Sequence, residues 1–91
     1  MSDDIPALER LKQRFLARAS EDLAALDQHL AHDDLSADGL RMMVHRLAGA
    51  AGTFGYGRVS EAAGGVEDAL LRDARDVQTA LKRLIQALRA L

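Results

Sequence analysis

The chain has 91 residues, a formal net charge of −2 at pH 7 and no cysteine. This length suits one domain over residues 1–91 and is short for an enzyme with separate cofactor and substrate lobes. The small negative charge argues against sequence-independent nucleic-acid binding, and the lack of cysteine excludes disulfides and thiolate zinc sites. Leu and Ala are abundant while only 3% of residues are aromatic, a composition that favours an all-α fold.

Charged residues interrupt every apolar stretch well before the roughly 20 residues that a membrane-spanning helix requires. The first four residues, Met-Ser-Asp-Asp, are acidic and unlike a signal peptide. We therefore expect a cytoplasmic protein with no membrane contact. An initial Met and an apolar helical pattern that runs to the last residue favour a free-standing protein.

Apolar side chains at steps of three and four residues predict the first two helices. The first should cover roughly residues 6–31, with Pro6 in its opening turn. The second should cover roughly residues 37–54, with Ser36 as its N-cap and Asp38 in its first turn. The apolar stripe of the first helix comprises Leu8, Leu11, Phe15, Ala19, Leu23, Leu26 and Leu30.

Two further helices follow Gly55 and Gly57, which end the second helix. The third should span roughly residues 58–72, with Val59, Ala62, Val66 and Leu70 on its inner face. Its adjacent Gly64 and Gly65 are a weak point that close packing by a neighbouring helix would make tolerable. The fourth begins after Asp73 or Asp76 as cap and continues to the C-terminus. Short connections then predict an antiparallel up-down-up-down four-helix bundle.

His45 departs from the amphipathic pattern of the second helix. At about 100° per residue, its side chain points roughly 150° from the centre of the apolar stripe. Ala48, Gly49 and Gly52 share this outward face, so nothing bulky shields the imidazole. Each helical glycine costs on the order of 1 kcal/mol relative to alanine, which suggests close approach by another molecule. The stripe itself comprises Leu40, Met43, Leu47, Ala51 and Phe54.

An accessible imidazole with small neighbours suits a nucleophile that a large partner must reach. A neutral imidazole nitrogen can attack phosphorus without a general base, so phosphoryl acceptance is the chemistry that fits His45. The alternative is a solvent-facing histidine without a role.

The run from His45 to Gly55, His-Arg-Leu-Ala-Gly-Ala-Ala-Gly-Thr-Phe-Gly, resembles the signature of histidine-containing phosphotransfer (HPt) domains. That signature is usually His-x-Leu-Lys-Gly-x-Ala followed by a hydrophobic residue and Gly. The resemblance implies a monomeric helical bundle in which His45 takes a phosphoryl group from the aspartate of one receiver domain and passes it to another. It implies response-regulator receiver domains as partners, with a hybrid histidine kinase as a further candidate. It also implies no cofactor in this chain, Mg²⁺ being supplied by the receiver.

The chain departs from the signature at Ala48, where the family commonly has a lysine that contacts the phosphoryl oxygens. Arg41, one turn before His45 on the same face, is our candidate for the missing positive charge, while Arg46 points about 100° away. By resemblance, a polar residue on the third helix hydrogen-bonds the imidazole, and Glu67 occupies the corresponding position. Glu67 would hold one tautomer of the ring; the alternative is a solvated carboxylate on a helix flank.

The predicted docking surface for a receiver surrounds His45. It includes the apolar Met42 and the small residues Ala48, Gly49 and Gly52. Antiparallel pairing with the first helix places a rim at the same level, formed by Arg18, Asp22 and Ala25.

Several other interpretations of the sequence compete with phosphotransfer between receivers. One is a helical adaptor that performs no chemistry, and another is the phosphoacceptor domain of a chemotaxis-type histidine kinase. His29 and His32 have metal-ligand spacing but lack a third strong ligand, so we expect no metal site there and prefer cationic histidines at a helix C-terminus. The glycines near residue 52 do not form a nucleotide loop, because no strand precedes them.

Overall fold

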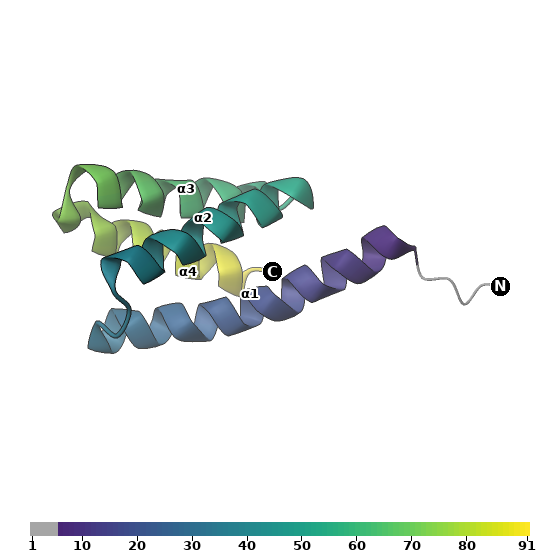
Figure 1. The fold of residues 1–91 in the computed structure, drawn as a ribbon, viewed down its shortest axis with the longest axis horizontal. Helices are drawn as coiled ribbons and strands as arrows, with labels where there is room; N and C mark the ends of the chain where they lie inside the picture. Colours follow the sequence, from purple (N-terminus) through teal and green to yellow (C-terminus); the bar gives the residue numbers. More distant parts are fainter. Residues whose placement is uncertain (1–5) are drawn as a thin grey trace.

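The computed structural model describes residues 6–91, and it is an all-α bundle of four helices (Figure 1). The predicted fold class is therefore confirmed, and the helix bounds agree with the predicted ranges to within a few residues. The helices are α1 (Ala7–His32), α2 (Ala37–Thr53), α3 (Gly57–Arg72) and α4 (Val77–Arg89), with a short 3₁₀ helix, η1 (Ala74–Asp76), before α4.

The ends of the helices follow local capping chemistry. The hydroxyl of Ser36 accepts a hydrogen bond from the backbone N–H of Gly39 at 3.0 Å, which caps α2 as predicted. Gly55 adopts a φ of 84° just after α2, a conformation that strains residues with a Cβ.

Asp76 precedes α4 but its side chain makes no cap bond, whereas Asp73 accepts the backbone N–H of Arg75 at 3.0 Å. The hydrogen bonds from Arg75 lower the pKa of Asp73.

All four helices contribute apolar side chains to one core. The buried residues of α3 are Val59, Ala63, Val66 and Ala69, while the predicted Ala62 and Leu70 are only half-buried. This core fixes the rotation of each helix about its own axis, and so decides which side chains face the solvent. Its other members are Phe15, Ala19 and Leu26 from α1, Leu40, Val44, Leu47 and Ala51 from α2, and Leu81, Leu84, Ile85 and Leu88 from α4.

The N-terminal part of α1 projects beyond the other helices (Figure 1). Leu8 and Leu11, which we predicted in the inner stripe, are 65% and 49% exposed because no other helix runs beside them. The core begins at Phe15, whose ring stacks on Tyr56 with centroids 5.3 Å apart. The periodic pattern therefore predicted the helix correctly but overestimated how much of it is buried.

The loop between α1 and α2 is tied to the end of α1 by His29. The backbone N–H of Leu35 donates to Nδ1 of His29 at 3.0 Å, and His29 is only 8% exposed. Because an imidazolium has no acceptor nitrogen, this bond requires the neutral ring. Our expectation of a cationic histidine at this helix end is therefore wrong for His29.

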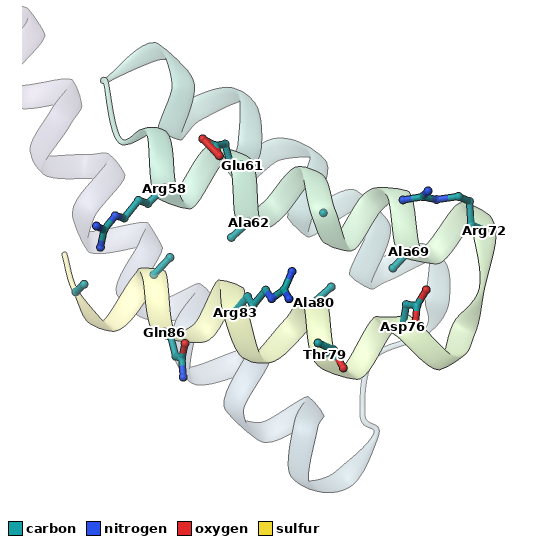
Figure 2. A pocket seen from close by; sticks show the side chains of 13 residues that line it. Arg58, Glu61, Ala62, Ala69, Arg72, Asp76, Thr79, Ala80, Arg83 and Gln86 are labelled. Carbon is teal, nitrogen blue, oxygen red and sulfur yellow. The ribbon is translucent and has the colours of Figure 1, made fainter.

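The close packing by a neighbouring helix that would make Gly64 and Gly65 tolerable is not observed at these two residues. A Cβ built on either residue would meet no heavy atom within 4 Å. Gly65 instead lines an open groove between α3 and α4, with the guanidinium groups of Arg58, Arg72 and Arg83 around it (Figure 2).

Candidate functional site

His45 lies near the middle of α2, and 77% of its side chain is exposed. The neighbouring Val44 and Leu47 are buried at 0% and 1% exposure, which fixes the orientation of α2 against the core. With these two residues facing inward, the helical rotation directs His45 outward. The outward placement predicted from the sequence is confirmed.

The imidazole of His45 contacts a carboxylate from the next helix. Nδ1 of His45 lies 2.8 Å from Oε2 of Glu67 in α3, and the side chain of Glu67 is 28% exposed. An ionised carboxylate can only accept, so Nδ1 donates its proton to Glu67; in the neutral ring the lone pair then lies on Nε2. The predicted contact between Glu67 and the imidazole is therefore present, and it involves Nδ1 and not Nε2.

Small residues surround the exposed ring along α2. A Cβ added at Gly49 would meet no heavy atom within 4 Å, and Gly49 and Gly52 are both exposed. Met42, one turn before His45, is 68% exposed. Ala48 is half-buried and packs partly against the core. The surface beside His45 is therefore open to a partner at the two glycines and at Met42.

Packing within the protein also favours glycine at position 52. A Cβ at this position would come 3.3 Å from Oγ of Ser60, which donates to the carbonyl oxygen of Ala48 at 2.9 Å. This bond joins α3 to α2 one turn after His45. The sequence offered no pattern that singles out Ser60, because the contact depends on how the two helices pack.

The charged residues predicted around His45 are arranged differently from our expectation. Arg41 is exposed, and its Nη2 donates to Oδ1 of Asp38 at 3.3 Å, within its own helix. Arg46 crosses instead to α1, where its Nη2 donates to Oδ1 of Asp22 at 2.9 Å. Sequence reasoning set Arg46 aside because it points away from His45, and missed that this direction leads to a carboxylate.

The three residues of the predicted rim on α1 differ in their exposure to solvent. Arg18 is exposed, and Ala25 is half-buried. Asp22 is only 4% exposed, so its placement on a solvent-facing rim is wrong. It is buried because α1 turns this side towards α2, where Arg46 covers the carboxylate.

Other candidate chemistry lies away from His45. The groove in Figure 2 is formed by α3 and α4, and neither His45 nor Glu67 lines it. Within residues 6–91, no cluster of three or more His, Asp or Glu side chains is suited to hold a metal ion. None of the helices described here is both long enough and apolar enough to span a bilayer.

Comparison with protein-family models places this geometry in a known context. The model of the Hpt domain matches residues 10–91, which covers all four helices from the second turn of α1 onward. A search of curated proteins and a search of solved structures each gave no match. Because the family match extends over most of the chain, the protein belongs to the Hpt domain family, which implies histidine phosphotransfer in a phosphorelay.

Proposed function

We propose that His45 is the phosphorylated residue and that it carries phosphoryl groups between receiver domains of a multistep phosphorelay. The observation that carries the proposal is the exposed imidazole whose Nδ1 is bound by Glu67, in a chain of the Hpt domain family. With Nδ1 held by Glu67 and 77% of the side chain exposed, Nε2 is the nitrogen that we propose for phosphoryl attack. A histidine without a role would not need an oriented ring.

The transfer step can be written from these groups. The Nε2 lone pair attacks the phosphorus of a receiver phosphoaspartate; the new N–P bond forms as the P–O bond to the aspartate breaks, and the carboxylate leaves. The ring becomes a phosphoimidazolium whose Nδ1–H points at Glu67. A carboxylate at this position stabilises the charge that develops on the ring. In the return step a second receiver's carboxylate attacks phosphorus and the imidazole leaves.

The division of labour between carrier and receiver explains how simple the site is. Transfer of a phosphoryl group needs a cationic clamp, usually with a divalent ion, around its oxygens. We propose that the acidic pocket and its Mg²⁺ belong to the receiver. This chain then needs only a nucleophile on a rigid helix and a surface that the receiver can cover.

The docking surface in this proposal is centred on His45 and includes Met42, Gly49 and Gly52. Arg41 is proposed to contact the phosphoryl oxygens where the family commonly has lysine, since position 48 is alanine. To do so its guanidinium must leave Asp38, an exposed contact of little strength. Arg41→Ala should therefore shorten the lifetime of phosphohistidine; an unchanged lifetime would remove Arg41 from the site.

The test exposes the protein to receiver domains of its source organism, each phosphorylated with acetyl phosphate in the presence of Mg²⁺. Mass spectrometry should locate an acid-labile, base-stable phosphate on His45, and His45→Gln should abolish it. Direct phosphorylation by phosphoramidate, which needs no receiver, provides a second measure of the nucleophile. Stable binding of a receiver without any phosphate on His45 would favour the helical adaptor. Phosphorylation only by an ATP-bound kinase domain would favour the phosphoacceptor domain of a chemotaxis-type kinase.

A further inference from the structure

A buried carboxylate lies beside the face that carries His45. Asp22 is 4% exposed, and its Oδ1 accepts Nη2 of Arg46 at 2.9 Å, with Nε of Arg18 at 3.9 Å. Its Oδ2 is buried, and no described residue forms a hydrogen bond with it. Asp22 is therefore an incompletely satisfied charge at the boundary between α1 and α2.

Stability alone does not explain this residue. Removing a carboxylate from water is costly, and replacing a buried ion pair by apolar residues of similar volume is often neutral or stabilising. The position lies between the buried Ala19 and Leu26 on the inner side of α1, where a leucine would fit the apolar pattern. A charge kept at such a place suggests a task for the group that it binds, which is Arg46.

Arg46 and His45 are neighbours in sequence, yet they reach in different directions. His45 contacts α3 through Glu67, and Arg46 contacts α1 through Asp22. The exposed strip of α2 is thus flanked by a carboxylate on the α3 side and by a guanidinium on the α1 side. The side chains of Arg46 and Arg18 are 39% and 59% exposed, so each retains donors that face solvent.

We propose that Arg46, together with Arg18, forms a cationic docking edge for the acidic phosphorylated pocket of a receiver domain, and that Asp22 is the positioning residue of this edge. The inference rests on the proposed function and deepens it by naming the electrostatic determinant of docking. Asp22 itself does not touch the partner. By holding Arg46 in one orientation, it reduces the freedom that the guanidinium loses on binding.

The chain provides a matched control for Arg46. Arg89 of α4 donates its Nη2 to Asp27 of α1 at 3.0 Å, and its side chain is 61% exposed. This is also an ion pair between α1 and another helix, but it joins α1 to α4 and not to the helix that carries His45. Arg89→Ala therefore removes the same charge and the same type of contact away from the proposed edge.

The experiment measures transfer from a phosphorylated receiver that is active with the wild-type protein, as a function of receiver concentration and salt. Arg46→Ala should raise KM about tenfold, the effect of losing about 1.4 kcal/mol, while kcat changes little. It should also weaken the salt dependence of KM, since one screened attraction is lost. Arg46→Lys should recover part of the loss, and Arg89→Ala should behave as wild type.

Substitutions of Asp22 distinguish the effect of the orientation of Arg46 from the effect of its charge. Asp22→Leu should raise KM, although its melting temperature should be at least that of the wild-type protein. Asp22→Asn keeps an acceptor for Arg46, so its KM should lie between those of the wild type and Asp22→Leu. A KM for Arg46→Ala equal to that of Arg89→Ala would overturn the proposal. An unchanged or lower KM for Asp22→Leu would overturn the positioning role, because charge alone would then account for docking.

The outcome is distinguishable from failure of the proposed function. All of these variants should react with phosphoramidate at the wild-type rate, because His45 and Glu67 are untouched. If the wild-type protein accepts no phosphate on His45 from any donor, the proposed function fails. If the wild-type protein does accept phosphate but Arg46→Ala and Arg89→Ala have the same KM, only the proposed docking edge fails.

Discussion

Removing the carboxylate of Glu67 should slow phosphoryl transfer to His45 without unfolding the bundle. Hydrogen bonds to charged groups contribute about 1.5–3 kcal/mol when they are protected from water. Here the side chains of Glu67 and His45 are 28% and 77% exposed, so solvent screening reduces the value to about 1 kcal/mol. One kcal/mol in the barrier corresponds to about a fivefold loss of rate for Glu67→Ala.

The substitution Glu67→Gln separates orientation of the ring from stabilisation of its charge. The amide oxygen can still accept from Nδ1, but a neutral hydrogen bond has roughly half the strength of a charge-assisted one. The expected loss is therefore about twofold, smaller than for Glu67→Ala. Asp68→Ala is the control, since Asp68 is the next residue, is exposed and carries the same charge.

Rapid-quench measurement of transfer from a phosphorylated receiver gives the rates, and nitrogen-15 NMR of the imidazole gives the tautomer. The wild-type ring should carry its proton on Nδ1, and Glu67→Ala should shift the population towards the other tautomer. Equal rates for Glu67→Ala and Asp68→Ala, with an unaltered tautomer, would refute the argument that Glu67 orients the nucleophile.

Three further outcomes follow from the fold. Gly49→Leu should raise the melting temperature, since leucine favours a helix over glycine by about 0.5–1 kcal/mol, but it should block phosphoryl transfer. The control Gly65→Leu should raise the melting temperature by the same amount and still permit transfer. Transfer by both variants would contradict the proposed docking surface. Leu26→Ala should cost about 2–5 kcal/mol in denaturant unfolding, whereas Leu8→Ala should stay within about 0.5 kcal/mol. His29→Ala should cost about 1–3 kcal/mol because the N–H of Leu35 loses its acceptor; an unchanged midpoint would show that water replaces the ring.

Local rules account for most of the secondary structure. The spacing of leucines and alanines, Ser36 as a cap and Gly55 as a terminator each act within a few residues, so their effects are visible in the sequence. The same holds for His45, because the rotation of one helix decides that a side chain opposite its apolar stripe faces solvent. The predicted burial of Leu8 and Leu11 was wrong for the complementary reason that burial needs a neighbouring helix.

Contacts between helices required the folded protein. The contact between the imidazole of His45 and Glu67 was predicted from the family resemblance, whereas the pairing of Arg46 with Asp22 and the bond from Ser60 to Ala48 were not predicted. Each depends on the axial shift and the rotation of two helices relative to each other. These are set by the summed packing of the whole core, and no single stretch of sequence encodes them. The sequence alone thus determines that His45 faces the solvent, while the packing of the helices determines which charged side chains surround it.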